Sequence, residues 1–88
     1  SDPARGYNGL ALCDIADGSY DSALENITAG LSGASTDEMQ DLLFNEITVY
    51  EKKLDFATAL SKTEEYVKMF PTDETAAKEL TFLQSRVN

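Results

Sequence analysis

Residues 49–60 decide the fold and read Val49-Tyr50-Glu51-Lys52-Lys53-Leu54-Asp55-Phe56-Ala57-Thr58-Ala59-Leu60. The stretch contains the end of one helix, a tight turn and a second helix that begins after Asp55, a residue type that caps helix N-termini. An earlier stretch has the same layout, since Tyr20, Ala23 and Leu24 stand 36 residues before Phe56, Ala59 and Leu60. The two stretches predict two helical hairpins.

The spacing of apolar residues extends this pattern to five helices along the chain. Apolar residues recur at positions i, i+3, i+4 and i+7, and no stretch shows the alternation of a strand. In the first expected helix the inward stripe is Tyr7, Leu10 and Ala11, interrupted by Asp14, and in the third it is Met39, Leu43, Ile47, Tyr50 and Leu54. Counted with their caps, the expected helices are residues 3–17, 19–32, 35–54, 55–70 and 73–87. Short connections between them force neighbouring helices to run antiparallel. The predicted fold class is all-α.

Particular residues mark the expected helix ends. Gly18 is suited to the left-handed conformation that ends a helix, and Ser19 is suited to cap the next one. Ser35 and Glu38 have the spacing of a capping box, in which each side chain accepts a hydrogen bond from the backbone of the other residue. Pro71 ends the fourth helix, and Thr72 or Asp73 caps the fifth.

Length and composition describe a small domain with a thin core. A chain of 88 residues buries only about 60–65% of its unfolded surface, and the hydrophobic share here is 42%. No apolar stretch approaches the roughly 18 residues that span a bilayer, so we expect no membrane insertion. The sequence starts without methionine, and we expect a fragment of a larger protein whose compartment, cytoplasmic or extracytoplasmic, stays unassigned.

The charge is strongly acidic and unevenly distributed. The formal net charge is −9, and residues 1–50 contain nine acids with Arg5 as their single base. Phosphate backbones and anionic membranes are repelled by such a surface, so we expect no nucleic-acid partner. A basic protein or peptide would instead be attracted.

The residue inventory argues against an enzyme and against a cofactor. Histidine is absent from the sequence, so Ser-His and Cys-His nucleophiles cannot form within it, and one cysteine cannot make an internal disulfide. Cys13 lies among leucines and isoleucine and is expected to be buried. Paired carboxylates such as Asp37 and Asp41 are expected to be solvated helix surface. The sequence therefore predicts no catalytic, metal or cofactor site.

The two predicted helical hairpins resemble a tetratricopeptide repeat, a helix–turn–helix unit of 34 residues. The signature residues are Tyr7, Leu10, Gly18, Tyr20, Ala23, Leu24, Tyr50, Phe56, Ala59, Leu60, Pro71 and Leu80. The resemblance implies a short right-handed α-solenoid of antiparallel hairpins in a single domain, 1–88. Its parts would be repeat one at about 4–35, repeat two at about 36–71 and a capping helix at about 73–87.

The same resemblance implies where a partner binds, because the first helix of each unit lines the concave face in this family. Carried over by alignment, that face contains Arg5, Asn8, Leu12, Ile15, Asp41, Phe44, Thr48, Glu51, Lys52, Thr75, Lys78, Phe82 and Arg86. The residues that we predict to contact a partner are Asn8, Leu12, Ile15, Phe44, Thr48, Glu51, Lys52, Lys78 and Phe82. The implied function is a protein–protein interaction module for a peptide or partner helix. The alternative is a structural or self-associating segment of a longer array.

Overall fold

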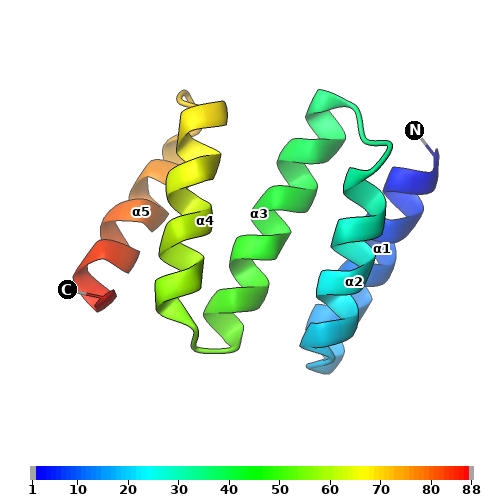
Figure 1. Ribbon diagram of the computed structural model, residues 1–88, viewed down its shortest axis with the longest axis horizontal. Coiled ribbons are helices and arrows are strands. Elements are labelled where there is room, and N and C mark those ends of the chain that lie inside the picture. Colours follow the sequence, from blue (N-terminus) through cyan, green and yellow to red (C-terminus); the bar gives the residue numbers. More distant parts are fainter. Residues whose placement is uncertain (1, 88) are drawn as a thin grey trace.

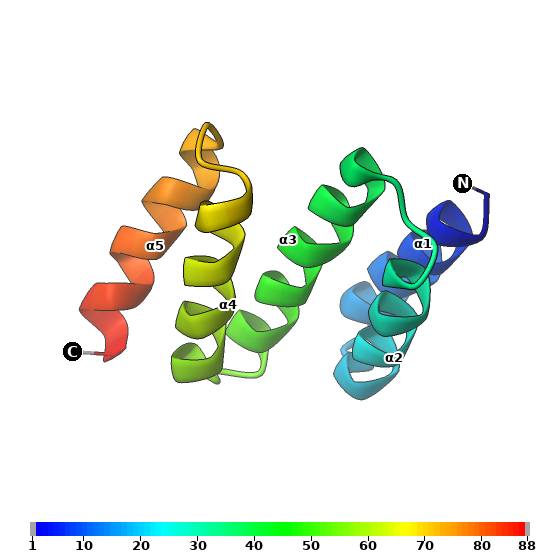
Figure 2. The same cartoon turned by 45° about the horizontal axis from the view of Figure 1, so that its top comes forward.

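A computed structural model describes residues 2–87 and contains five α-helices within that range. They are α1 (Asp2–Asp17), α2 (Tyr20–Leu31), α3 (Thr36–Lys52), α4 (Phe56–Met69) and α5 (Glu74–Val87). Successive helices run antiparallel and follow one another in a row, with α1 and α2 at one end and α5 at the other (Figures 1 and 2). The result is a slab with extents of 38 × 28 × 16 Å. The predicted all-α class is confirmed.

Side-chain caps hold the starts of α3, α4 and α5. At α3 the predicted capping box is present: the Ser35 amide donates to Glu38 Oε1 at 2.9 Å, and the Glu38 amide donates to Ser35 Oγ at 3.3 Å. Asp55 Oδ1 accepts from the Thr58 amide at 3.2 Å at the start of α4. Asp73, rather than Thr72, caps α5. The start of α2 differs from the prediction, because the Ser19 side chain makes no capping hydrogen bond.

The two hairpin turns have the same backbone geometry. After α1 the Gly18 amide donates to Ile15 O and the Ser19 amide to Asp14 O; after α3 the Leu54 amide donates to Glu51 O and the Asp55 amide to Tyr50 O. This pair of bonds is the Schellman motif, whose central residue is left-handed. Gly18 has φ 80° and Leu54 has φ 63°. Leu54 was expected to continue the inward stripe of the third helix, but it lies in the turn with 74% of its surface exposed.

The interior consists of two apolar clusters that share helix α3. The first cluster contains Ala11, Ala23, Ile27, Leu42 and Val49, and the second contains Ile47, Ala59, Tyr66, Ala76 and Leu83. Because α3 supplies Leu42 and Val49 to the first and Ile47 to the second, it is the helix that joins the two halves.

Buried positions repeat at an interval of 36 residues. The fully or almost fully buried pairs are Ala11 with Ile47, Ala23 with Ala59, Ile27 with Thr63, and Gly30 with Tyr66. Leu83 of α5 lies a further 36 residues after Ile47 and is also buried. The sequence interval seen in the two turns therefore extends to the packing of the helices.

The predicted inward stripe of α1 is wrong in part. Ala4 and Ala11 are buried, whereas Tyr7 is 37% exposed and Leu10 is 54% exposed. The cause is the close approach of α1 to α2, which turns the small residues of α1 inward. Cys13, expected to be buried, is exposed as well.

Most of the remaining signature residues are buried or half-buried. Ala23 and Ala59 are fully buried, and Pro71 follows Phe70, the C-cap residue of α4. Half-buried signature residues packed against the two clusters are Tyr20, Leu24, Tyr50, Phe56 and Leu60. Leu80 is half-buried on α5.

Candidate functional site

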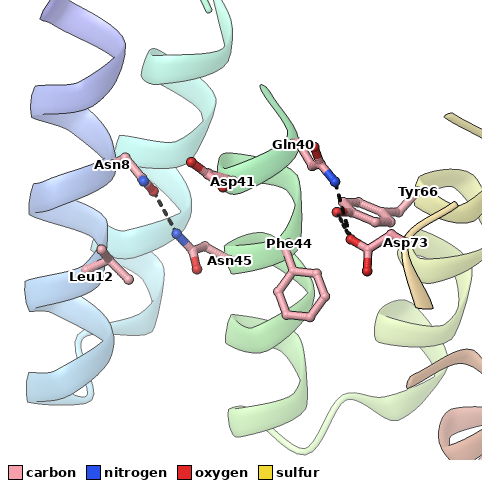
Figure 3. A pocket seen from close by; sticks show the side chains of 8 residues that line it. All are labelled: Asn8, Leu12, Gln40, Asp41, Phe44, Asn45, Tyr66 and Asp73. Carbon is pink, nitrogen blue, oxygen red and sulfur yellow. Dashed lines mark hydrogen bonds between the residues drawn. The ribbon is translucent and has the colours of Figure 1, made fainter. Parts of the chain in front are cut away.

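A cavity of about 390 Å³ opens between α1 and α3 and extends to the turn before α5. Figure 3 shows side chains from α1, α3, α4 and this turn around it. Its lining residues are Asn8, Leu12, Gln40, Asp41, Phe44, Asn45, Tyr66 and Asp73. We call this cavity the α1–α3 groove. It brings together the first helices of the two hairpins.

One hydrogen bond crosses the groove between the two first helices. Asn45 Nδ2 of α3 donates to Asn8 Oδ1 of α1 at 2.7 Å (Figure 3). Each asparagine amide retains one group that makes no hydrogen bond with another described residue: Nδ2 of Asn8 and Oδ1 of Asn45. Since a peptide backbone offers both an acceptor and a donor, these two groups can hydrogen-bond to an extended peptide.

The opposite wall of the groove is held by Asp73. Its Oδ2 accepts from Tyr66 OH at 2.6 Å and from Gln40 Nε2 at 3.3 Å, and its Oδ1 accepts from the Ala76 amide at 3.1 Å. The hydrogen bond from Tyr66 is the main reason that the pKa of Asp73 lies below its usual range. Burial, followed by the bond to Asp73, raises the pKa of Tyr66 to about 12. Neither group is poised for proton transfer near neutral pH.

Leu12 and Phe44 give the groove apolar surface. Leu12 is 50% exposed. The half-buried ring of Phe44 packs edge-on against Tyr66, with ring centroids 5.7 Å apart. The ring centroids of Tyr66 and Phe70 are 4.9 Å apart. These ring contacts fix the position of Phe44 from behind, because edge-to-face pairs at this distance are favourable. The groove therefore combines an ordered aromatic wall with polar groups.

Three of the predicted contact residues line this groove: Asn8, Leu12 and Phe44. Four lining residues were missed, and they are Gln40, Asn45, Tyr66 and Asp73. Gln40 and Asn45 had a usable signal, since residues 40, 41, 44 and 45 share one helical face. Tyr66 and Asp73 had none, because they come from outside the first helices and reach the groove through their mutual hydrogen bond.

The other predicted contact residues lie outside the lining of the groove. Ile15 is half-buried against the first apolar cluster, and Thr48 Oγ1 donates to the Phe44 carbonyl of its own helix at 3.2 Å. Lys52 and Lys78 are exposed. Phe82 is 43% exposed on α5, where the Arg86 guanidinium lies 5.4 Å from its ring centroid. The structure thus separates the predicted face into the groove and scattered positions.

Glu51 of α3 faces Glu79 of α5. Burial, together with the negative charge of Glu79, raises the pKa of Glu51 to about 7. Glu79 Oε2 is buried and has no hydrogen-bond partner within residues 2–87. When it is protonated, Glu51 can donate a hydrogen bond to Glu79. Such a bond would link α3 to α5.

Between residues 2 and 87 the structure has no group of three or more acidic or cysteine side chains that could hold a metal ion. Within the same range, each helix is too short or too polar to cross a membrane. Comparison of the chain with protein-family models, with curated proteins and with solved structures returned no match.

Proposed function

We propose that the chain is a non-catalytic protein–protein interaction module of the tetratricopeptide-repeat type, which binds an extended peptide in the α1–α3 groove. The observation that carries this proposal is the groove itself, about 390 Å³ in volume and lined by the first helices of two successive hairpins. That placement matches the surface on which the repeat family carries its ligands.

The repeat character of the chain supports the proposal. The two Schellman turns and the buried pairs at an interval of 36 residues make the two hairpins equivalent units. α5 continues the series, with Leu83 at the position of Ala11 and Ile47. Units that repeat in this way stack their first helices along one face, which creates an extended binding surface.

The polarity of the groove also suits a peptide. Leu12 and Phe44 offer apolar surface, and the Asn8–Asn45 pair offers one donor and one acceptor to a backbone. Paired asparagine amides can hold the backbone of an extended peptide without contacting its side chains. Specificity for the peptide sequence would then come from the other residues that line the groove.

The proposal is tested by selecting binders from a random dodecapeptide display library and measuring their affinity by fluorescence anisotropy. Leu12→Ser removes exposed apolar surface from the groove, so we expect at least tenfold weaker binding with an unchanged helical circular-dichroism spectrum. Phe82→Ala is the matched control, because Phe82 is similarly exposed but lies outside the groove. Binding that is lost in Phe82→Ala and retained in Leu12→Ser would contradict the assignment.

A self-associating segment is the second candidate function. The outer side of α1 carries an open, largely apolar hollow of about 450 Å³, lined by Pro3, Gly6, Tyr7 and Leu10. Exposed apolar surface of this kind marks interaction sites. Sedimentation velocity at several concentrations distinguishes the candidates: a concentration-dependent dimer that Leu10→Ser abolishes supports self-association, and a monomer throughout contradicts it.

A further inference from the structure

The surface around the α1–α3 groove carries more acidic residues than the lining of the groove itself. A second cavity of about 140 Å³ adjoins it, and Asn8 and Asp41 line both. Four acids line the two cavities, and they are Asp37, Glu38, Asp41 and Asp73. Arg5 is the one base in these linings, and its Nε lies 3.7 Å from Glu38 Oε2. A ligand that spans both cavities meets a strongly negative surface.

These acids differ in whether they are already engaged. Asp73 accepts hydrogen bonds from Tyr66, Gln40 and the Ala76 amide. Glu38 accepts from the Ser35 amide and faces Arg5. These two carboxylates are therefore parts of the fold.

Asp41 is different. Like Asp37, it is exposed, and no residue from 2 to 87 makes a hydrogen bond or ion pair with its carboxylate, but of these two acids only Asp41 lines both cavities. Figure 3 shows it extending from α3 toward α1, on the same side as the Asn8–Asn45 bond. An unengaged carboxylate at this position is free to pair with a ligand.

The surroundings of Asp41 suit a long cationic side chain. Phe44, one helical turn further along α3, and Leu12, across the groove on α1, line the same cavity as Asp41 and give it apolar surface. Lysine and arginine place their methylene stems on apolar surface while their charged ends stay in a polar environment. A cation near an aromatic ring gains further attraction.

We infer that the α1–α3 groove recognises a basic peptide segment, with a lysine or arginine whose charged group pairs with Asp41 and whose stem lies along Leu12 and Phe44. This inference rests on the proposed function and adds the chemistry of the ligand. Charge complementarity selects this occupant: the net charge of −9 attracts basic segments over long distances, and acidic or phosphorylated peptides are repelled from both cavities.

A positional-scanning library of fluorescein-labelled dodecapeptides tests the inference directly. In each pool one central position is fixed as Lys, Arg, Leu or Glu, and binding to the whole chain is measured by anisotropy. We expect the Lys and Arg pools to bind at least tenfold more tightly than the Glu pools. Their advantage should shrink as salt is raised, because ion pairs at exposed sites are screened.

Two matched variants test whether the carboxylate of Asp41 pairs with the basic side chain of the peptide. Asp41→Asn should weaken the binding of the Lys and Arg pools about tenfold and leave the binding of the Leu pools unchanged. Glu64→Gln removes the same unit of charge from an exposed position on α4 and should change neither. Circular dichroism checks that both variants keep the fold.

The possible failures are distinguishable. Leu or Glu pools that bind as tightly as the Lys pools would overturn the basic ligand while leaving a peptide-binding groove in place. An equal loss in Asp41→Asn and Glu64→Gln would overturn the role of Asp41. Pools that all fail to bind would contradict the proposed function together with this inference.

Discussion

The two helical hairpins use the same positions with side chains of different size. In the first hairpin the buried positions include Ala11 and Gly30; in the second, the corresponding positions hold Ile47 and Tyr66. The α1–α2 backbones accordingly stay in contact along more of their length than those of α3 and α4. Position thus sets which face of each helix turns inward, while side-chain size sets how closely the helices approach.

This difference in size also places the groove. In the second hairpin Tyr66 fills the position of Gly30 and reaches far enough to donate its hydroxyl to Asp73. A glycine at that position has no side chain with which to form a wall. The proposed binding surface therefore lies where the second unit departs from the first.

Gly30→Ala should change the stability of the chain more than any other substitution proposed for the two hairpins. A Cβ at this position would lie 3.1 Å from the Cβ of Tyr7 and 3.1 Å from Leu42 Cδ1. Leu42 is fully buried, and the Tyr7 Cβ can move only with the backbone of α1. We expect a net loss of about 1–2 kcal/mol, since overpacking outweighs the gain in helix propensity of about 1 kcal/mol.

Gly9→Ala is the matched control for that substitution. Gly9 is also inside a helix, but a Cβ built there meets nothing within 4 Å. The same change should stabilise the chain by about 0.5–1 kcal/mol. Urea denaturation of both variants checks the prediction, and two changes of the same sign would show that close packing at Gly30 is not what limits that position.

The two turns supply the next comparison, because the same left-handed position holds Gly18 in one hairpin and Leu54 in the other. A residue with a Cβ is strained there by about 1 kcal/mol. Removing the Leu54 side chain costs little packing, because that residue is 74% exposed. Leu54→Gly should therefore stabilise the chain by about 0.5 kcal/mol, after the larger chain entropy of glycine in the unfolded state is subtracted.

Gly18→Ala should have the opposite effect and destabilise the chain by about 1 kcal/mol, although a Cβ at Gly18 meets nothing within 4 Å. Thermal melts of the two variants, recorded side by side, measure both signs. Destabilisation by Leu54→Gly would mean that the second turn depends on contacts of the Leu54 side chain rather than on backbone geometry.

Much of this architecture is predictable from the sequence, for local reasons. Ser35, Asp55 and Pro71 act on their own helix ends, so their effects depend on a few neighbouring residues, and the structure has them as predicted. The position of α1 is different. Its sequence offers Tyr7 and Leu10 as an inward stripe, but the close approach at Gly30 decides which face is buried. That approach involves residues on two other helices, which a single-helix pattern does not contain.

The groove was predictable only in part for a similar reason. Asn8, Leu12 and Phe44 follow from the helical face on which they lie. The contribution of Tyr66 and Asp73 depends on a hydrogen bond between α4 and the following turn, and no periodic pattern encodes that bond. Asp14 shows the same effect outside the groove: it interrupts the apolar stripe of α1, yet its Oδ2 accepts from Ser22 Oγ and Asn26 Nδ2 at 2.8 Å each.

The smallest expected effect concerns Glu51, whose counterpart in the first hairpin is the uncharged Ile15. The pKa of Glu51 is raised from 4.5 to about 7, so the folded chain holds a proton between these values that the unfolded chain has released. Stability should therefore fall as the pH rises from about 4.5 to about 7 and stay at its lower level above that. Because Glu51 is half-exposed, solvent screens this interaction, and we expect a change of only about 0.3 kcal/mol.

Glu51→Gln isolates this contribution, since a glutamine amide donates to Glu79 at every pH. The variant should lack this decline between pH 4.5 and 7 and should melt at a higher temperature than the unmodified chain at pH 8. Glu64→Gln, which removes a carboxylate from the exposed face of α4, should retain the decline. If both variants kept it, the pH dependence would arise from the overall negative charge, and the contact between α3 and α5 would not be its source.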